Sequence, residues 1–486
     1  MQIDILFINP GNRKKTFQNL GADLAAIEPP FLMASFAAFL RNKNYNVKII
    51  DANAQSITPT ELAQQVKEIN PKLCSVIVYG GQPSASTQTM GIAGEICKAI
   101  KKETNIPLAI GGLHPSALPE RTLKEEAVDF VIEGEEQIPL LELLQYINKE
   151  IDLSDISGVW YYKDEKVVNN PKAKLLDNLD EYLPQAAWDL LPMELYRAHN
   201  WHCFDHINER EPYAAIYTSL GCPYKCAFCC INAPFGGPSI RYRTPEVVVD
   251  EIEFLVKEYK VKNIKFIDEM FVLEEKHYMK ITELLIEKEL DINIWCYARV
   301  DTVKPENLKK MKQAGFNWFC LGIESASAFV RDGAAKKLRY RDIQELVSTI
   351  QEHGIRVIAN FMVGLPDDNH ETMQETLDMA VEINADFFNI YSTMAYPGSK
   401  LYDEAIKNGV RLPDNWFDYS QHAKNQIPLP TKHLEAKEVL KFRDYAWNYY
   451  FTNDRYLNMI EKKFGKDALE HIKFMTSKQL ERNYDS

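Results

Sequence analysis

Hydrophobic and polar positions along the first 148 residues follow an alternating pattern of strands and helices. Short apolar runs rich in Ile and Val, each closed by Gly, Asn or Pro, occur at QIDILFINP, NVKIIDAN, LCSVIVYGG, IPLAIGG and DFVIEG. Longer amphipathic stretches, such as PPFLMASFAAFLRNK and ELAQQVKEIN, separate these runs. Short buried strands separated by helices are typical of a parallel sheet covered on both faces. The pattern predicts a doubly wound, Rossmann-like α/β domain over residues 1–148, with its ligand beyond the carboxyl ends of the strands.

The alternation weakens between residues 149 and 212. The segment SGVWYYKDEKVVNN has the pattern of a small hairpin, and LPQAAWDLLPM has the Pro and Trp content of a connector. We therefore expect a linker that contains a small hairpin and packs on its neighbours.

A second alternating series begins at residue 213. Helical patterns such as TPEVVVDEIEFLVKEY and HYMKITELLIEKEL separate its strands, which are expected at Ala214–Ser219, Asn263–Ile267, Ile292–Ala298, Trp318–Ile323, Val357–Val363 and Phe387–Tyr391. Six strand–helix units in a row predict a partial (β/α)6 barrel over residues 213–398, with its chemistry at the carboxyl ends of the strands. The strands then stop, and amphipathic helices predict a helical extension over residues 399–486.

Composition and charge narrow the class of protein. The chain has 486 residues, of which 46% are hydrophobic and 26% are charged, the balance of a globular protein with more than one core. Its net charge of −13 argues against a nucleic acid or an anionic membrane as partner. No apolar run reaches about 18 residues, and no basic leader precedes the first strand. We expect a cytoplasmic protein without a transmembrane segment.

The cysteines are unevenly distributed. Four of the nine lie between Cys222 and Cys230, in TSLGCPYKCAFCC, and the others are scattered among apolar neighbours, as expected for core residues. Cys222, Cys226 and Cys229 form a C-x3-C-x2-C arrangement directly after the first barrel strand. Three thiolates on one tight loop can hold three corners of a [4Fe–4S] cluster and leave the fourth iron open. The alternative is a structural zinc site, for which the usual second pair of ligands is missing nearby.

With these cysteines the segment from Tyr213 to Gly398 resembles the radical S-adenosylmethionine (radical SAM) superfamily. Phe228 matches an aromatic position between the second and third cysteines, expected near the adenine. The resemblance implies that the open iron binds the amino and carboxylate groups of S-adenosylmethionine. Reductive cleavage then gives a 5′-deoxyadenosyl radical, with the electron coming from a donor of the flavodoxin or ferredoxin type.

Later strands carry further positions that the resemblance assigns to S-adenosylmethionine. The acidic pair in FIDEMF follows the second strand and suits the methionine ammonium, although such a pair is also a common helix cap. The Arg in WCYARVD could meet a carboxylate or contact the sulfonium region through its backbone, and the alternative is a surface salt bridge. The motifs LGIESAS and ANFMVGLPDD supply residues for the ribose and methionine, and a Lys twelve positions after the Glu of LGIESAS suits the methionine carboxylate. The candidate residues are Asp268, Glu269, Arg299, Glu324, Ser325, Lys336, Asn360 and Gly364.

The first domain resembles the cobalamin-binding domains that precede many radical SAM enzymes. The matching segments are INPG, EPPFLMASFAAFL, DANA, GGLHPSALPE and DFVIEGEEQ. The resemblance implies cobalamin contacts at Gly111, Gly112 and Gly134, and a pocket-lining or structural role for His114. The turn that carries Asp-x-His in methionine-synthase-type domains reads Asp-Ala-Asn-Ala here, so a bound cobalamin would lack a histidine ligand from it.

The order of the two domains resembles that of cobalamin-dependent radical methylases. It implies methyl transfer to an unactivated carbon of a small-molecule or lipid-like substrate. Two alternatives stay open: a cobalamin-associated radical cyclase or oxidoreductase that transfers no methyl group, and a non-catalytic corrinoid-binding protein. The chain leaves the substrate and the oligomeric state undetermined.

Overall fold

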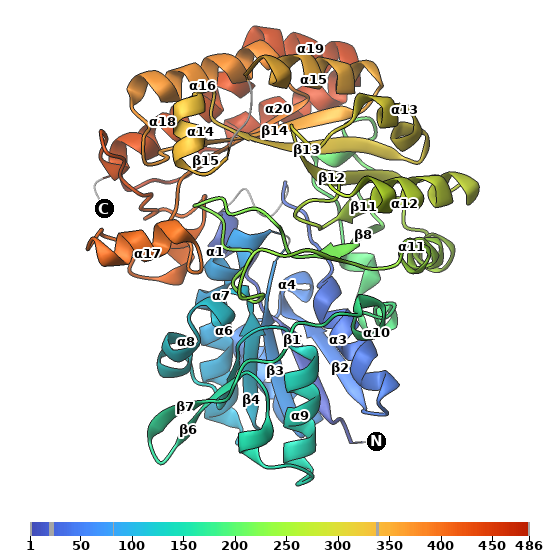
Figure 1. The fold of residues 1–486 in the computed structure, drawn as a ribbon, viewed down its shortest axis with the longest axis vertical. Helices are drawn as coiled ribbons and strands as arrows, with labels where there is room; N and C mark the ends of the chain where they lie inside the picture. Colours follow the sequence, from blue (N-terminus) through green and yellow to red (C-terminus); the bar gives the residue numbers. More distant parts are fainter. Residues whose placement is uncertain (1, 19–23, 81, 337–339, 485–486) are drawn as a thin grey trace.

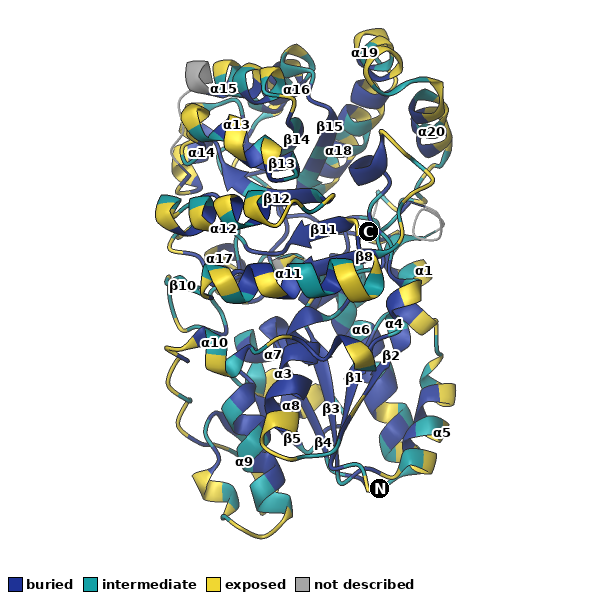
Figure 2. Ribbon diagram, turned by 90° about the vertical axis from the view of Figure 1, so that its right-hand side faces the viewer, coloured by how far each residue is buried: buried dark blue, intermediate teal, exposed yellow. Residues whose placement is uncertain are grey.

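The chain folds into two α/β units, one above the other in Figure 1. The computed structural model describes residues 2–18, 24–80, 82–336 and 340–484. The N-terminal unit is drawn in blue at the bottom of Figure 1, and the second unit, from green to red, lies above it. In both units the strands are buried, whereas exposed residues concentrate on the outer faces of the helices (Figure 2).

The N-terminal unit is built on a seven-stranded sheet in the order β2-β1-β3-β4-β5-β6-β7. The first five strands are parallel, and the last two form an antiparallel hairpin at one edge. Their bounds are β1 Ile5–Asn9, β2 Val47–Asp51, β3 Leu73–Val78, β4 Leu108–Gly112, β5 Phe130–Ile132, β6 Val159–Lys163 and β7 Lys166–Asn169. The predicted hairpin is therefore present, and it extends this sheet instead of standing apart in a linker.

Successive residues of β1 face opposite cores, which is why the sheet is covered on both faces. Ile5 and Phe7 belong to one hydrophobic cluster, and Leu6 and Ile8 belong to another. The helices of this unit are α1 Arg13–Phe17, α3 Phe31–Asn42, α4 Ala52–Gln55, α5 Pro59–Ile69, α6 Pro83–Glu103, α7 Leu113–Ala117, α8 Pro119–Glu125 and α9 Gln137–Ile147. Helices α3 and α9 contribute to the first cluster, and α5 and α6 to the second. The predicted doubly wound domain is confirmed.

The connection between the units is ordered by short elements. These are η1 Leu153–Asp155, α10 Leu179–Tyr182, η2 Trp188–Leu190, η3 Met193–Leu195 and η4 Trp201–Cys203. Trp188 donates its indole N–H to Glu251 of the second unit, and Tyr196 donates its hydroxyl to Asp51 of the first. The connector therefore packs on both units at once.

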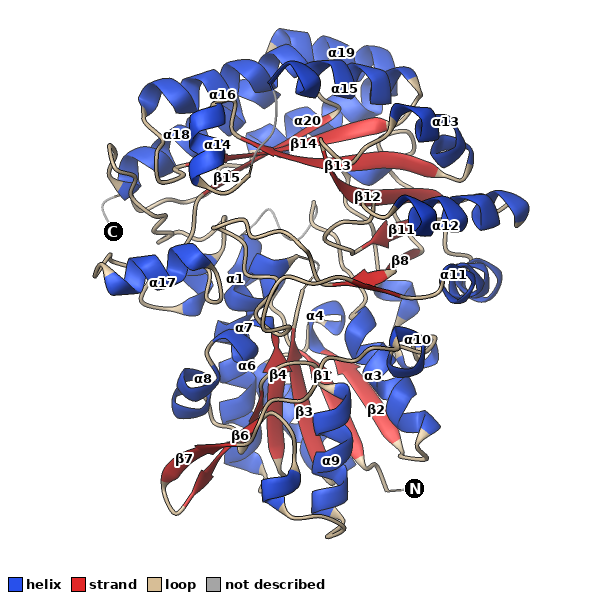
Figure 3. Ribbon diagram, in the orientation of Figure 1, coloured by secondary structure: helices blue, strands red, loops and turns tan. Residues whose placement is uncertain are grey.

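The second unit is a curved sheet of six parallel strands in the order β15-β14-β13-β12-β11-β8, which confirms the predicted partial barrel (Figure 3). The strands are β8 Tyr213–Ile216, β11 Asn263–Phe266, β12 Asn293–Arg299, β13 Phe316–Glu324, β14 Arg356–Val363 and β15 Phe387–Ser392. The intervening helices are α11 Pro245–Tyr259, α12 Glu275–Glu287, α13 Pro305–Gln313, α14 Ala328–Gly333, α15 Tyr340–Glu352 and α16 His370–Ile383. Strands β8 and β15 are the two edges of this sheet.

The last three C-terminal helices cover one edge of the partial barrel, whereas the two short elements before them pack beside the cysteine loop and against α6. In chain order these elements are α17 Lys400–Lys407, η5 Trp416–Tyr419, α18 Ala436–Phe451, α19 Asp454–Phe464 and α20 Lys466–Ser477. Tyr450 of α18 stacks on Phe388 of β15 at a ring distance of 4.2 Å and donates its hydroxyl to the carbonyl of Ala385. These helices therefore share the core of the barrel. Among the helices of the described residues, none combines the length and apolar character needed to cross a membrane.

Candidate active site between the two domains

A glycine turn starts the cysteine loop. Strand β9, Ser219–Leu220, pairs with β10, Arg241–Tyr242, and closes the base of the loop. Gly221 follows with φ +90°, and a Cβ there would overlap the carbonyl oxygen of Ser239. Only glycine adopts this conformation without strain, so the turn requires it. The base of the loop therefore fixes the point at which Cys222 leaves the sheet.

The three cysteines of the motif share one partly enclosed loop. Cys222 is buried, Cys226 and Cys229 are half-buried, and all three are free thiols. Burial raises the pKa of Cys222 to about 11 and raises the pKa of the other two thiols as well. Cys222 and Cys229 pack with Leu113 and Tyr79 of the N-terminal unit in one apolar cluster.

The donor set fits an iron–sulfur cluster better than a single metal ion. Within the described part of the chain, no group of three or more His, Cys, Asp and Glu side chains converges on a point that could hold one ion. A structural zinc ion needs four ligands at one point, whereas a [4Fe–4S] cluster binds each thiolate through a different iron. Three free thiols on one loop suit the second case.

The acidic pair after β11 divides into two roles. Asp268 is buried and accepts hydrogen bonds from the backbone N–H of Thr218 at 2.6 Å, from the Thr218 hydroxyl and from the Ser219 hydroxyl at 2.7 Å. Burial raises its pKa to about 6. Its carboxylate therefore holds the chain just before the cysteine loop. Glu269 instead lines the cavity described below, and burial raises its pKa to about 8.

Arg299, at the end of β12, is buried and forms an ion pair with Asp301. Its Nε lies 2.8 Å from Oδ1 of Asp301, and its Nη2 lies 3.0 Å from Oδ2. The guanidinium also lies over the ring of Tyr224, 4.0 Å from the ring centre. Tyr224 belongs to the cysteine loop, so its contact with Arg299 joins that loop to the end of β12.

Glu324 and Lys336 form a buried ion pair beside the cysteine loop. Glu324 ends β13 at a register shift and has φ +68°, a conformation that residues other than glycine adopt rarely. A Cβ on Gly322 would lie 2.6 Å from the Lys336 ammonium and 2.8 Å from the Glu324 carboxylate. Burial raises the pKa of Cys226, and the positive charge of Lys336 partly offsets that effect. The pair therefore lies near the loop, and the predicted contacts of both residues with S-adenosylmethionine stay a prediction.

The remaining predicted contacts of the barrel have protein neighbours. Ser325 lies 3.2 Å from the hydroxyl of Thr376, and the Asn360 amide donates to the sulfur of Cys320 at 2.8 Å. Phe228 packs against small apolar clusters beside the loop. A Cβ on Gly364, where φ is +79°, would overlap Val439 of α18. The group that approaches Gly364 closely is therefore helix α18 of the protein itself. The sequence did not indicate this structural reason for a glycine.

The residues predicted to contact cobalamin have different surroundings: some pack against the N-terminal unit, and one also faces the second unit. A Cβ on Gly111 would lie 2.9 Å from the Glu136 side chain, and one on Gly112, with φ +129°, would overlap the Val78 carbonyl. Gly134, with φ +110°, has the carbonyl of Pro234 in the second unit 3.5 Å from the position of its missing Cβ. His114 is enclosed: its Nδ1 lies 3.1 Å from the Thr87 hydroxyl, and burial lowers its pKa to about 3.

Asp51, which begins the Asp-Ala-Asn-Ala turn, is fully engaged by protein groups. It accepts hydrogen bonds from Tyr196 at 2.9 Å, from Asn9 at 2.9 Å and from the backbone N–H of Ala54 at 2.9 Å. The turn therefore joins the N-terminal sheet to the connector.

A cavity lies between the two units, where the strand ends of the first meet the cysteine loop of the second. The empty space between its atoms is about 440 Å³, part of which is open to solvent. Its lining residues are Leu32, Tyr79, Gly80, Gln82, Ser86 and Leu113 from the N-terminal unit and Tyr217, Ser219, Leu220, Gly221, Ile231, Pro234, Phe235 and Glu269 from the barrel. The wall is mainly apolar, with a few polar groups, as in small-molecule sites.

The most informative residues that sequence reasoning missed are Tyr79 and Glu136. Tyr79 follows β3, lines the cavity and donates its hydroxyl to Glu136 at 3.0 Å. The other carboxyl oxygen of Glu136 is buried with no hydrogen-bond partner among the described residues, and burial raises the pKa of this group to about 8. The signal was available, because the YGG that ends the third strand lies at the edge where doubly wound sheets bind ligands.

Two family models match the two units. The Radical SAM superfamily model matches residues 216–380, and the B12 binding domain model matches residues 19–144. The chain therefore combines a B12-binding domain with a radical SAM domain that follows it, and it is an enzyme. These two domains imply a [4Fe–4S] cluster, S-adenosylmethionine and a cobalamin as its cofactors.

Curated relatives span most of the chain. An uncharacterized methyltransferase of Pyrococcus horikoshii is 29% identical over 93% of this chain and 92% of its own length. The anaerobic magnesium-protoporphyrin IX monomethyl ester cyclase of Rubrivivax gelatinosus is 27% identical over 96% of this chain and 83% of its own. The hopanoid C-2 methylase of Rhodopseudomonas palustris is 24% identical over 82% of this chain and 69% of its own.

Two solved structures share the fold. OxsB, a cobalamin-dependent S-adenosylmethionine radical enzyme, matches with a TM-score of 0.70 at 15% identity, over 98% of this chain and 72% of its own. TsrM from Kitasatospora setae, a radical S-adenosylmethionine methyltransferase, matches with a TM-score of 0.66 at 18% identity, over 85% of this chain and 76% of its own. The arrangement of a B12-binding unit below a radical SAM barrel is therefore shared with both.

Proposed function

We propose that the chain is a cobalamin-dependent radical SAM methyltransferase that methylates an unactivated carbon. One observation carries the proposal: a single cavity is walled on one side by the strand ends of the B12-binding unit and on the other by the base of the cysteine loop. Two cofactors held on opposite sides of one space can act on the same substrate, which is the positioning that this chemistry needs.

The barrel supplies the residues for radical generation. Cys222, Cys226 and Cys229 would hold a [4Fe–4S] cluster, which when bound supplies the electron that cleaves S-adenosylmethionine. Glu269 would accept hydrogen bonds from the methionine ammonium, and that cation would in turn favour the ionised form of its carboxyl group. Lys336, beside the same loop, would meet the methionine carboxylate and exchange its present partner Glu324 for it.

The N-terminal unit supplies the second wall. A cobalamin, when bound, carries the methyl group that the proposed reaction delivers. Tyr79, Gln82 and Ser86 are polar residues of the lining, and the Tyr79 and Ser86 hydroxyls donate to Glu136 and to the Val78 carbonyl. One carboxyl oxygen of Glu136, behind Tyr79, has no hydrogen-bond partner among the described residues. These groups fit a large polar-edged cofactor at the strand ends. No histidine stands in the turn that begins at Asp51, so the cobalamin would be bound without a histidine from it.

The apolar part of the wall would keep water out. Leu32, Leu113, Leu220 and Ile231 contribute to the lining. A dry, preorganised cavity suppresses quenching of a radical by unwanted partners and holds the reacting groups together. We further propose a small-molecule or lipid-like substrate, a flavodoxin- or ferredoxin-type electron donor, and the reducing cytoplasm as the compartment, since the thiols must stay reduced.

A cyclase or oxidoreductase reaction is the second candidate. It is favoured by the relatives that are magnesium-protoporphyrin IX monomethyl ester cyclases, which align with nearly the whole chain. The same cavity and the same radical-generating residues would serve it, but no methyl group would reach the product.

Anaerobic reconstitution with methyl-labelled S-adenosylmethionine tests the proposal. The holoprotein should show iron–sulfur and corrin absorbance together, release 5′-deoxyadenosine under a low-potential reductant, and transfer label to the corrinoid and to an acceptor in a small-molecule and lipid extract. Replacing the three motif cysteines by Ala should remove the iron and the 5′-deoxyadenosine and leave the corrin bands. Release of 5′-deoxyadenosine with no label outside S-adenosylmethionine would reject methyl transfer and favour the cyclase reading.

A further inference from the structure

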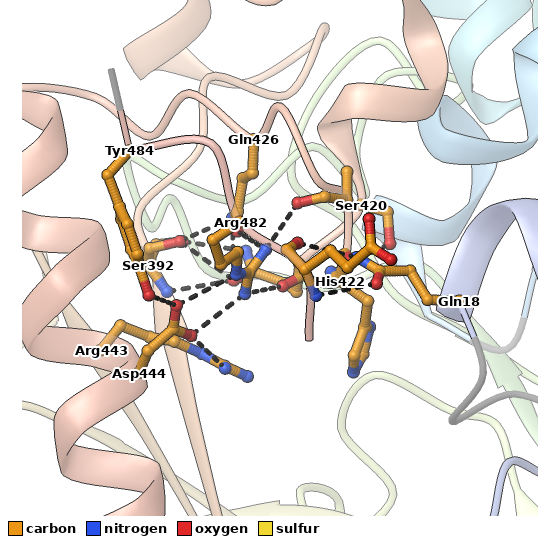
Figure 4. A network of polar contacts seen from close by, with 12 residues as sticks. Gln18, Ser392, Ser420, His422, Gln426, Arg443, Asp444, Arg482 and Tyr484 are labelled. Carbon is orange, nitrogen blue, oxygen red and sulfur yellow. Dashed lines mark hydrogen bonds and ion pairs between the residues drawn. The ribbon is translucent and has the colours of Figure 1, made fainter. Parts of the chain in front are cut away.

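Residues 478–484, which we call the C-terminal tail, form no helix or strand, yet they include an arginine with a buried side chain, Arg482. The side chain of Arg482 is 2% exposed. Its guanidinium donates to the carbonyl of Ala423 at 2.7 Å, to the carbonyl of Gln421 at 2.8 Å and to Oε1 of Gln426 at 3.1 Å (Figure 4). Enclosing an arginine so completely is costly unless its donors are satisfied, so this side chain is held in a built socket.

An acidic residue on α18 completes the socket. The Arg482 guanidinium contacts both oxygens of Asp444, at 3.0 Å and 3.1 Å. Asp444 also accepts from Arg443 at 2.9 Å and from the Tyr484 hydroxyl at 3.0 Å. Two arginines and a tyrosine therefore share one carboxylate, and the tail is joined to the helix that covers β15.

The segment that receives Arg482 is itself attached to the carboxyl end of β15. We refer to residues 415–426 as the bridge. The side chain of Gln421 accepts from the backbone N–H and the hydroxyl of Ser392, both at 3.1 Å, and donates to the Ser392 carbonyl at 2.9 Å. Gln426 donates to the Ser392 hydroxyl at 2.7 Å. Arg482 therefore fixes two loop positions that in turn fix the last strand of the barrel.

The bridge also reaches the cysteine loop through Tyr396. The Gln421 amide donates to the Tyr396 hydroxyl at 3.4 Å, and that hydroxyl donates to the carbonyl of Tyr419 at 3.2 Å. The Tyr396 ring packs in the apolar cluster that contains Cys222 and Cys230. A continuous set of contacts thus runs from the tail to the loop that carries the motif cysteines.

The other side of the bridge is attached to the B12-binding unit. Phe417 fits against α6, where a Cβ on Gly91 would lie 2.5 Å from its ring. Trp416 lies between His114 and Arg121, each 4.4 Å from its ring centre. The Ser420 hydroxyl donates to the carbonyl of Thr16 at 2.6 Å.

The tail touches the same unit directly through Gln18. The Gln18 side chain donates to the carbonyls of His422 at 2.6 Å and Glu481 at 3.1 Å, and it accepts from the Glu481 backbone N–H at 3.0 Å. Tail, bridge and N-terminal unit therefore meet at one junction (Figure 4).

We propose that Arg482 is a positioning residue for the interdomain site. It locks the bridge to β15, and the bridge sets Tyr396 against the cysteine loop while η5 holds the B12-binding unit. This inference concerns how the two walls of the cavity are kept in register, so it goes beyond the proposed reaction and does not depend on which reaction the site performs.

Hydrogen–deuterium exchange on the full-length protein tests the first half of the inference. Arg482→Gln should accelerate amide exchange about tenfold or more in peptides that cover residues 415–426 and 392–398, since it removes several charge-assisted hydrogen bonds at once. Arg482→Lys keeps the charge and should be intermediate. Lys478→Gln is the matched control, because Lys478 lies in the same tail and contacts the ring of Phe474 instead.

The electron paramagnetic resonance spectrum of the reduced, reconstituted cluster tests the second half. Arg482→Gln should alter the line shape at unchanged iron content, Arg482→Lys should alter it less, in step with its intermediate exchange, and Lys478→Gln should match the wild type. Exchange in the bridge no faster than in the control, or acceleration spread evenly over the chain, would overturn the proposal. So would a mobile bridge with an unaltered cluster spectrum. None of these readouts requires methyl transfer, so they stand apart from the test of the proposed function.

Discussion

At the scale of single residues, the adjacent acids Asp268 and Glu269 differ in their surroundings, and we therefore expect different roles for them. Asp268 and Glu269 are adjacent carboxylic acids at the end of one strand, and burial raises the pKa of both. Asp268 has its oxygens taken by Thr218 and Ser219, whereas Glu269 lines the cavity. Asp268 therefore supports the start of the cysteine loop, and the ligand-binding role is proposed for Glu269.

Substituting these two acids should separate loop support from ligand binding. Asp268→Asn keeps one acceptor oxygen but turns an NH2 group toward the donors of Thr218 or Ser219, so it should lower the free energy of unfolding by about 1–3 kcal/mol and reduce iron loading. Glu269→Gln should load iron normally and weaken the binding of S-adenosylmethionine. Iron analysis, thermal denaturation and the S-adenosylmethionine dependence of 5′-deoxyadenosine release measure these effects. Equal iron loss in both variants would contradict the division of roles.

Glu136 should make the stability of the cofactor-free protein depend on pH. Its pKa is about 8 in the folded state, raised from 4.5 by burial. The folded state therefore binds the proton more tightly than the unfolded chain, so this contribution is complete below about pH 4.5 and is lost as the pH rises through about 8. Chemical denaturation at pH 5, 6, 7 and 8 should show the wild type losing stability, and Glu136→Gln should flatten that slope. An identical slope in both proteins would refute the assignment.

At the scale of elements, the end of β13 has an irregular register next to the ion pair of Glu324 and Lys336. The register between β13 and β14 shifts after Gly322, and Glu324 takes a left-handed conformation next to Lys336. Irregularities of this kind at strand ends redirect side chains, and here they bring a carboxylate and an ammonium together beside the cysteine loop.

Gly322→Ala should affect ligand binding more than stability. The new methyl group would meet the ends of two flexible side chains, Lys336 and Glu324, which can move aside. We expect the S-adenosylmethionine affinity to fall about tenfold with a nearly unchanged melting temperature. Gly237→Ala, where a Cβ has open space, is the matched control. Gly364→Ala should instead destabilise the fold, because Val439 of α18 stands in the way; a binding loss confined to that variant would argue against the Gly322 assignment.

At the scale of the whole molecule, buried polar contacts hold the two units together. Glu28, from the loop before α3, pairs with Lys265 of the barrel at 2.9 Å and 3.2 Å, and the Lys265 ammonium lies over the ring of Trp295. The side chain of Lys265 is 3% exposed, so the pair is shielded from solvent at its basic end. Such a contact fixes how the N-terminal unit sits on the barrel.

Lys265→Met should weaken the docking of the two units. It leaves the mostly buried Glu28 without this partner and should lower the free energy of unfolding by about 3 kcal/mol. Glu28→Gln should also destabilise the protein, and the double variant should lose less than the sum of the two, as expected for directly interacting groups. Urea denaturation provides the three values, and additive losses would show that the two side chains act independently.

Much of the architecture could be predicted from the chain because it depends on local pattern. The β-strand period, the helical stripes and the glycine, asparagine and proline positions predicted both the doubly wound domain and the partial barrel, and these are confirmed. The motif of Cys222, Cys226 and Cys229 is equally local, since its three cysteines lie within eight consecutive residues directly after the first barrel strand. The roles of the individual ligand-binding residues stay predictions that the proposed experiments address.

The sequence by itself therefore determined the two folds, their order and the loop on which the radical chemistry is proposed to occur. Only the tertiary structure decided which acid faces the cavity, that the hairpin extends the first sheet, that Gly364 serves α18, and that His114 is enclosed by Trp416. It also joined Arg482 to a strand end ninety residues earlier in the chain. The physical reason is that these outcomes depend on contacts between residues far apart in sequence, which no local period of hydrophobic positions encodes.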